Sequence, residues 1–237
     1  MSTLASTSLD DADADTTAAS AHGRVSPAKV FAVALTLGTL TAVIDGRGTH
    51  HQLPVRSWTG RASRSDRFLL DHCHGSTIDL GCGPGRLAAE LRDRGHDVLG
   101  VDASRSAIAE ARRRDIPVVC GSLFDPVPSE GSWGTALLAD GNIGIGGDPA
   151  GLLVRAGRII RPDGRIVVDL APAGTGLRVH QLHLRAGGLA STSFPWAELG
   201  PDALPETAAA AQLTIAQVTR RRGRTVAVLT HAREQGR

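Results

Sequence analysis

Cysteine is scarce in this sequence. Its three cysteines, Cys73, Cys82 and Cys120, lie in separate segments and show no C-x-x-C spacing. An odd number of unclustered cysteines gives no disulfide framework and favours a reducing compartment. His72 and His74 flank Cys73, but consecutive residues cannot easily coordinate one ion, so we expect no metal site.

The sequence also lacks a segment that reads as a membrane span or a secretory signal. Its longest apolar stretch, Val30 to Ile44, is shorter than the roughly 20 residues that a membrane-crossing helix needs. Residues 1–24 contain four aspartates and lack the basic start of a signal peptide. We therefore expect a cytoplasmic protein.

Neither sign of charge dominates, and aromatic residues are few. The 26 Lys and Arg residues against 24 Asp and Glu residues give no global electrostatic argument for a nucleic-acid partner. The basic cluster Arg220 to Arg224 is read as a solvated turn between two strands, with a phosphate-binding patch as the alternative. With no tyrosine and 3% aromatics, the core must consist mainly of Leu, Val, Ile and Ala.

The length of 237 residues suits one α/β domain with an ordered extension. Residues 1–25 are rich in Ser, Thr, Ala and Asp and are predicted to form a disordered tail. Residues 26–62 are predicted to form an extension, and residues 63–237 the main domain. The extension is expected to hold a helix at 28–36, then a hairpin of strands 39–44 and 50–55 around the turn signal Asp45 to Gly48.

Strand and helix patterns alternate after residue 63, which predicts a parallel sheet covered on both faces. Ser104 and Asp148 are natural N-caps for two of the helices. The predicted helices span 63–73, 87–94, 104–114, 149–160 and 203–211, and a turn is expected at 161–164. The predicted strands span 77–80, 97–101, 116–120, 135–139 and 165–170, then 177–185 and 189–194 in an inserted hairpin near 175–196, and finally 213–218 and 225–230 in a closing antiparallel hairpin.

The segment T-I-D-L-G-C-G-P-G-R, from Thr77 to Arg86, places three glycines between a strand and a helix. Glycine allows a sharp turn and a close approach of the backbone to a ligand, and the helix amides can meet a polar group. A nicotinamide-binding loop would need G-x-G-x-x-G, whereas this loop reads G-x-G-x-G with Pro84 inside it. The carboxylate of Asp79 suits a ligand with a cationic ammonium group and would repel a pyrophosphate.

Asp102 follows the second predicted strand, 23 positions after Asp79. A carboxylate there is well placed to accept hydrogen bonds from both ribose hydroxyls of a nucleoside. Its alternative role is to cap or stabilise the helix that begins after Ser104. Together with the glycine loop, Asp102 favours the ribose role.

The motifs D-L-G-C-G-P-G-R and V-L-G-V-D-A-S (Val98 to Ser104) resemble the first two motifs of class I methyltransferases that use S-adenosylmethionine. The resemblance extends over 76–168, and the chain also resembles a small bacterial subgroup of unassigned substrate. It implies an α/β, Rossmann-like, doubly wound seven-stranded sheet, mostly parallel, with an antiparallel C-terminal hairpin strand. The resemblance places the following residues at the cofactor: Asp79, Gly81, Cys82, Gly83, Gly85, Asp102, Ala103, Ser122, Leu123, Asp140, Gly141 and Asn142.

The finer roles are also implied by position in that family. Ser122 could bond the adenine amino group where many members have an acid, and Leu123 could lie against the ring. The segment Leu137 to Asp148 follows the fourth strand, where family members line the cofactor sulfur and the acceptor, and its four glycines predict an open loop. Asp140 is the candidate catalytic residue, as a base, a substrate ligand or a loop anchor. Asn142 could orient a substrate carbonyl, bond the cofactor or stabilise an Asx-type turn.

The predicted inserted hairpin carries further candidates. His180 and His183 lie three positions apart on one strand and should face opposite sides, so one could be a base if its face covers the site. Phe194, Pro195 and Trp196 could cap the substrate site or simply pack between the hairpin and the sheet.

The leading hypothesis is a methyltransferase that acts on a small molecule. The alternatives are an NAD-dependent oxidoreductase, which the glycine spacing disfavours, and a nucleic-acid methyltransferase. The latter often has an N/D-P-P-aromatic loop, and Asp140 to Ile143 lacks both prolines and the aromatic residue. A non-catalytic protein that keeps the cofactor fold is a further alternative.

Overall fold

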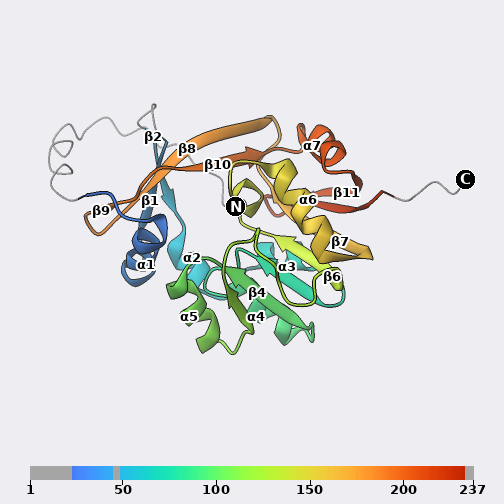
Figure 1. The fold of residues 1–237 in the computed structure, drawn as a ribbon, viewed down its shortest axis with the longest axis horizontal. Coiled ribbons are helices and arrows are strands. Elements are labelled where there is room, and N and C mark those ends of the chain that lie inside the picture. The colour runs from blue at the N-terminus through green and yellow to red at the C-terminus, as the bar shows by residue number, and fades with distance from the viewer. Residues whose placement is uncertain (1–22, 45–48, 233–237) are drawn as a thin grey trace, which may run out of the picture.

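The computed structural model describes residues 23–44 and 49–232 (Figure 1), and its centre is a seven-stranded sheet in the order β11-β12-β7-β6-β3-β4-β5. Five neighbouring strands are parallel, while β12 runs antiparallel to both β7 and β11. This confirms the mostly parallel sheet with a closing hairpin. The strands are β3 (Thr77–Leu80), β4 (Val98–Asp102), β5 (Val118–Cys120), β6 (Trp133–Leu138), β7 (Ile160–Leu170), β11 (Leu213–Arg221) and β12 (Arg224–His231).

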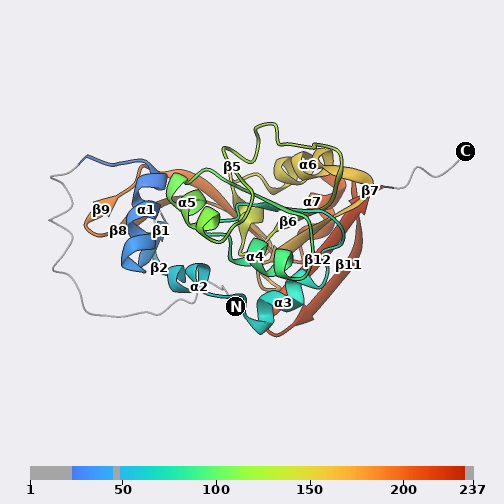
Figure 2. The same cartoon turned by 90° about the horizontal axis from the view of Figure 1, so that it is seen from below.

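Helices cover both faces of this sheet (Figure 2). One apolar cluster joins the sheet to α3 (Arg64–Leu70), α4 (Arg86–Asp93) and α5 (Arg105–Arg113). A second cluster joins it to α6 (Pro149–Ile159) and α7 (Leu204–Ala210). The large side chains of both clusters are mainly Leu, Ile and Val, as the composition predicted.

The helix starts follow the local sequence. The Ser104 hydroxyl accepts a hydrogen bond from the Ala107 amide at 3.3 Å, and the Asp148 carboxylate accepts one from the Gly151 amide at 3.0 Å. Both predicted N-caps are confirmed. At the start of α3, Ser63 and Asp66 form a reciprocal capping box, which satisfies two amides that a helix start leaves unpaired.

A second, antiparallel sheet assembles strands that lie far apart in the sequence; we call it the covering sheet. Its order is β10-β8-β1-β2, with β9 beside β8. The predicted N-terminal hairpin is confirmed, and its strand β1 pairs with the inserted strand β8, so that Val43 lies opposite His183. The strands are β1 (Leu40–Ile44), β2 (Thr49–Leu53), β8 (Leu177–Ala186), β9 (Leu189–Ala190) and β10 (Phe194–Leu199).

The inserted hairpin differs from the prediction in its returning strand. Only Leu189 and Ala190 pair next to the turn, and the main partner of β8 is β10, which begins where the predicted strand ended. The predicted turn at 161–164 is also wrong. Those residues belong to β7, where a register shift places Ile160 opposite Trp133 and Arg165 opposite Thr135. The extra residues form a bulge rather than a strand connection.

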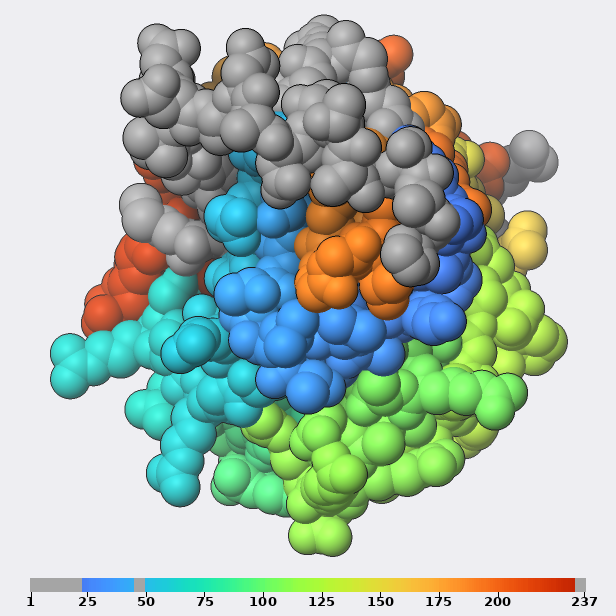
Figure 3. Space-filling model, turned by 90° about the vertical axis from the view of Figure 1, so that its left-hand side faces the viewer, coloured from blue at the N-terminus to red at the C-terminus, as the bar shows by residue number. Residues whose placement is uncertain are grey.

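The N-terminal elements pack on the covering sheet. α1 (Pro27–Leu37) contributes Val30 and Ala34 to an apolar cluster with Leu184 and Ala186 of β8. The Phe31 ring lies 5.8 Å from the Trp58 ring of α2 (Val55–Thr59), a helix that the sequence analysis missed. Figure 3 shows α1 in blue beside the orange turn that follows β8.

Two predicted segments lie partly or wholly outside the described residues. The predicted tail covers residues 1–25, and residues 1–22 of it lie outside the described part of the chain. The predicted turn at 45–48 lies outside it as well. The division at residues 25 and 62 stays a prediction. None of the helices in the described parts of the chain combines the length and apolar character needed to cross a membrane.

The loop after β6 is closed by β10 rather than open. Ile145 forms a β-bridge with Trp196, and a Cβ on Gly144 would overlap the carbonyl oxygen of Ala197. The glycine at 144 therefore permits contact between two backbones, which corrects the expectation of an open loop.

Replacing this glycine tests the contact. Gly144→Ala should lower the free energy of unfolding by about 1–3 kcal/mol, because β10 must move away from the loop. Urea denaturation measures the change. Gly157→Ala in α6 is the matched control, since its nearest neighbour would be an ordinary contact at 3.7 Å and alanine favours a helix. Equal stability of the two variants would contradict the close packing.

Candidate functional site

Three aspartates gather at the carboxyl ends of the parallel strands. Asp79 lies in β3, Asp102 ends β4, and Asp140 follows β6 by two residues. Since β4, β3 and β6 are adjacent and parallel, their carboxyl ends meet at one edge of the sheet. Open α/β sheets bind their ligands at this edge.

The glycine loop has the backbone that its sequence predicted. Gly81, Gly83 and Gly85 all have positive φ angles, of 80°, 54° and 81°. A Cβ on Gly83 would meet nothing within 4 Å, so this part of the loop is open to a ligand. The Cys82 side chain instead packs inward against Gly100, which leaves only its backbone available at the loop.

Asn142 clamps the glycine loop to the loop after β6. Its side-chain amide donates hydrogen bonds to the carbonyl oxygens of Leu80 and Gly81, at 2.9 and 2.8 Å. A Cβ on Gly81 would lie 2.5 Å from that nitrogen, so the contact requires glycine. The amide nitrogen of Asn142 thus binds the protein backbone, and the roles of this residue toward substrate or cofactor stay a prediction.

Asp102 shapes the other side of the glycine loop. One carboxylate oxygen accepts a hydrogen bond from the Gly83 amide at 2.9 Å, and the other accepts one from the Ser104 amide at 2.7 Å. Burial raises the pKa of Asp102, and these two amides oppose the rise. Each oxygen retains a lone pair for a further donor. Ala103, the next residue, is exposed.

Asp79 is buried without full hydrogen bonding. The residue is 1% exposed, and its Oδ2 atom has no partner. Desolvation raises the pKa of Asp79 to about 7, and the negative charge of Asp140 adds to the rise, while Arg86 opposes it. A buried carboxylate oxygen without a donor is costly, so this position favours a ligand that supplies a cationic N–H group.

The segment after β5 differs from the sequence prediction. The Ser122 hydroxyl accepts a hydrogen bond from the Phe124 amide, and the residue is exposed. The Leu123 side chain lies in the hydrophobic core at 5% exposure, which counts against its predicted packing on an adenine ring. Phe124 is 48% exposed and lies beside Gly146, so the exposed aromatic surface here comes from its ring.

Asp140 lies in a buried ion-pair network, which we define as Asp66, Arg86, Asp140, Asp169 and Arg224. Its two oxygens contact Arg86 at 2.5 Å and Arg224 at 2.6 Å. Arg224 also contacts Asp66 and Asp169, both at 2.7 Å, and Arg86 contacts the second oxygen of Asp66. Both arginine side chains are 6% exposed. Asp140 is thus an anchor, and its ion pairs argue against the predicted role as a general base.

The network also explains the backbone at Asp140. This residue has a φ of 52°, a left-handed conformation that costs a non-glycine residue free energy. Two charge-assisted hydrogen bonds hold it there. Sequence analysis missed Arg86 and Arg224 as site residues, and it placed Arg224 in a solvated turn. The only sequence signal was the position of Arg86 directly after the glycine loop.

Removal of one guanidinium tests the network. Arg224→Met should lower the free energy of unfolding at pH 7 by about 3–5 kcal/mol, because it leaves buried carboxylates unpaired. Urea denaturation gives this difference. Arg221→Ala, an exposed arginine in the same hairpin, should change stability by less than about 0.5 kcal/mol. A loss for Arg224→Met no larger than that of the control would refute the structural role.

Comparison with known proteins agrees with this geometry. Residues 78–164 match a family described as a methyltransferase domain. The chain is 37% identical over 101 residues to an uncharacterized 37.1 kDa protein in transposon TN4556 of Streptomyces fradiae, covering 39% of this chain and 29% of the relative. It is 32% identical over 106 residues to a demethylmenaquinone methyltransferase of Corynebacterium kroppenstedtii, a match that covers 44% of this chain and 46% of the relative. The chain thus spans less than half the length of these curated relatives.

Solved structures share the fold over more of the chain. A methyltransferase from Bacteroides fragilis, crystallised with S-adenosyl-L-homocysteine, has a TM-score of 0.73 at 19% identity and covers 87% of this chain and 94% of its own. The 1,6-didemethyltoxoflavin N1-methyltransferase of Burkholderia thailandensis has a TM-score of 0.57 at 20% identity. This match covers 75% of this chain and 81% of the solved one. Residues 78–164 are thus similar to a methyltransferase domain, and the chain shares the fold of these two solved methyltransferases.

Proposed function

We propose that this protein transfers a methyl group from S-adenosylmethionine to a small-molecule acceptor. The observation that carries the proposal is the buried, unpartnered Oδ2 atom of Asp79 at the end of the strand that leads into the open glycine loop. S-adenosylmethionine carries an ammonium group on its methionine end, and such a group supplies the donors and positive charge that this carboxylate lacks.

The remaining parts of the site fit a nucleoside. Asp102 is held by the Gly83 and Ser104 amides and keeps lone pairs for the two ribose hydroxyls. Ala103 and the backbone of Cys82 lie next to these groups in sequence. Phe124, rather than Leu123, offers an apolar surface for a base at the end of β5. The Ser122 hydroxyl is exposed and stays our candidate for a polar contact to adenine.

In the proposed reaction the protein positions the reactants and excludes water. The sulfonium group supplies an activated methyl carbon, and displacement requires the acceptor atom in line at roughly 3 Å. Asn142 and Arg86 join the glycine loop to the loop after β6, which contains Gly141. These two loops frame the position of the methyl carbon in the proposed complex. The covering sheet closes on the second loop through Gly144 and shields it from water.

A small acceptor is supported by the closed loop and by the balanced charge of the chain. The loop after β6 is pinned against β10, which restricts access to the edge of the sheet. The net charge of +2 gives no general attraction to nucleic acids. Two of the similar proteins, the demethylmenaquinone and didemethyltoxoflavin methyltransferases, are named for small-molecule acceptors.

Binding of the methyl donor tests the central claim. S-adenosylmethionine and S-adenosylhomocysteine should both raise the melting temperature, and NAD should not. Asp102→Ala should weaken S-adenosylmethionine binding by about 100-fold in isothermal titration calorimetry, since charged hydrogen bonds to two hydroxyls are lost. Asp97→Ala, an exposed aspartate just before β4, should bind like the wild type. Stabilisation by NAD alone would exclude the proposed function.

Asp79 predicts an unusual dependence of stability on pH. Its folded pKa of about 7 lies above the ordinary value of 3.8, so between these pH values the folded state keeps a proton that the unfolded state has lost. Raising the pH through that window therefore lowers the stability of the ligand-free protein, by about 1.4 kcal/mol for each pH unit crossed. Asp79→Asn should remove this loss.

The measurement compares urea unfolding at pH 5 and pH 8. Ligand-free Asp79→Asn should be at least as stable as the wild type at pH 8, with a smaller difference between the two pH values. Its affinity for S-adenosylmethionine should nevertheless fall about tenfold, because the ammonium group loses its counter-charge. If Asp79→Asn were less stable than the wild type at pH 8, burial of the ionised Asp79 carboxylate would not be destabilising, and the prediction would be wrong.

A further inference from the structure

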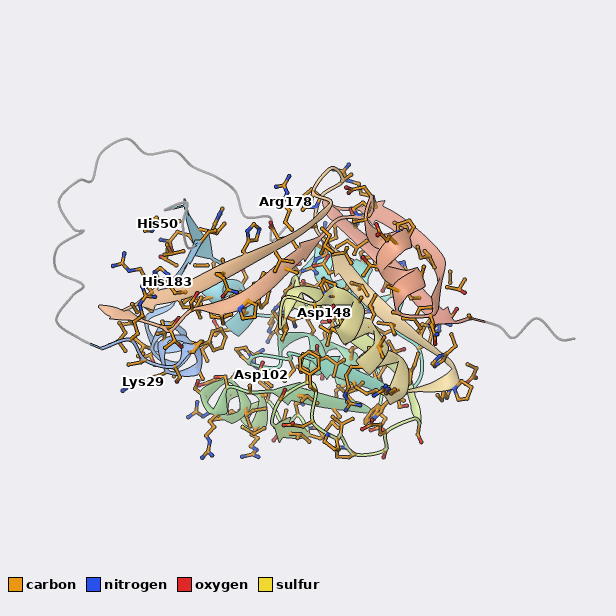
Figure 4. All side chains as sticks on the ribbon, turned by 45° about the horizontal axis from the view of Figure 1, so that its top comes forward. Lys29, His50, Asp102, Asp148, Arg178 and His183 are labelled. Atoms are coloured by element: carbon orange, nitrogen blue, oxygen red, sulfur yellow. The ribbon has the colours of Figure 1, made fainter. Side chains whose placement is uncertain are left out.

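The covering sheet has an inner and an outer face, and the inner face holds an unassigned polar pair. In β8 the even-numbered Leu182, Leu184 and Ala186 are buried, whereas Val179 and Gln181 are exposed. Side chains alternate along a strand, so His180 belongs to the inner face at this point of the sheet. His183 lies on the opposite face, as its spacing predicted, and Figure 4 labels it on the covering sheet.

His180 is paired with a carboxylate on the neighbouring strand. Its Nε2 atom lies 3.2 Å from Oε2 of Glu198, and the two side chains are 11% and 22% exposed. In the register of β8 and β10, His180 lies directly opposite Trp196, and Glu198 lies opposite the exposed Arg178. Directly opposite residues share a face, so the indole, the imidazole and the carboxylate are neighbours on the inner face.

This part of the covering sheet lies next to the loop after β6, which contacts the glycine loop. Trp196 forms its β-bridge with Ile145, and the Ile145 Cδ1 atom would lie 3.2 Å from a Cβ on Gly81. Leu199 follows Glu198 in β10, and its carbonyl oxygen accepts a hydrogen bond of 2.9 Å from the amide of Ala171, the residue after β7. The strand that carries Glu198 therefore runs between the carboxyl end of β7 and the loop that Asn142 clamps.

We propose that His180, oriented by Glu198, is the general base for the methyl acceptor. This inference rests on the proposed function and names its acceptor class, which is a flat, weakly acidic hydroxyl compound of the phenol type. A histidine held by a carboxylate is a common form of general base. The pair lies next to the indole of Trp196, which offers a flat apolar surface, and Asp140 is held in ion pairs and unsuited to the role.

In the proposed transfer, the Nε2–H of His180 donates to Glu198, which leaves the Nδ1 lone pair to take the hydroxyl proton of the acceptor. The acceptor oxygen forms a bond to the methyl carbon, and the carbon–sulfur bond breaks with its electron pair going to sulfur. The products are a methyl ether, a neutral thioether and an imidazolium ion whose charge is stabilised by Glu198.

His51 is the other histidine on this face. In the register it lies opposite Ala42 of β1, which lies opposite Leu184 of β8. It is 8% exposed, and its Nδ1 atom has no partner. Because no carboxylate is paired with it among the described residues and two strands separate it from β10, we assign the base role to His180.

The probe for this proposal is 4-nitrophenol, whose phenolate absorbs near 400 nm. In the presence of S-adenosylhomocysteine, the wild-type protein should bind the probe and increase the phenolate band at a pH at which most free probe is protonated. With S-adenosylmethionine it should form 4-nitroanisole, seen as loss of that band and by mass spectrometry. His180→Gln should reduce both the phenolate signal and the transfer rate at least tenfold, and Glu198→Gln should reduce the transfer rate by a smaller factor.

His183→Gln is the matched control, because it changes a histidine three residues away on the outer face. It should keep the phenolate signal and the transfer rate. Calorimetry with S-adenosylmethionine separates the two proposals, since His180→Gln should bind it like the wild type. Normal binding of the donor with no phenolate signal in the wild type, or an equal signal in His180→Gln, overturns the assignment. Failure of donor binding in the wild type would instead refute the proposed function.

Discussion

The contact between Asp140 and the two arginines is the interaction on which the site depends. Arg86 begins α4, Arg224 begins β12, and Asp140 follows β6, so these ion pairs join parts of the chain that lie up to 158 residues apart through Asp66. Three carboxylates against two guanidinium groups leave one uncompensated negative charge, and Asp79 lies nearby. Burying such a cluster is costly, and each arginine offsets part of the cost by bridging two or more carboxylates.

That excess of negative charge gives the site a chemical preference. Desolvation by burial raises the pKa of Asp79 far above the ordinary value, and repulsion from Asp140 adds to the rise, while Arg86 compensates for only part of it. A cationic ligand relieves both the desolvation and the repulsion. The same ion pairs occupy both oxygens of Asp140, and in the proposed transfer the His180–Glu198 pair of the covering sheet supplies the base.

The covering sheet shows how a common α/β frame acquires an individual site. Its strands come from residues 40–53 and 177–199, and neither hairpin has a second layer of its own. Paired through β1 and β8 and packed on α1, they form one layer whose inner face lies over the edge of the parallel sheet. The bridge between Ile145 and Trp196 links this layer to the loop after β6, so the proposed base and the proposed donor site lie on neighbouring segments.

The sequence by itself determined the local features. Alternating strand and helix patterns, the caps at Ser104 and Asp148, and the glycine loop with Asp79 and Asp102 are encoded within short windows, because propensity, capping and positive φ are local properties. Tertiary structure alone decided the partners of Arg224, Asn142, Leu123 and His180. Their roles arise from contacts across 32 to 158 residues or, for His180, from the register between two strands. No periodicity in the sequence records such pairings, since they exist only once the sheets have formed.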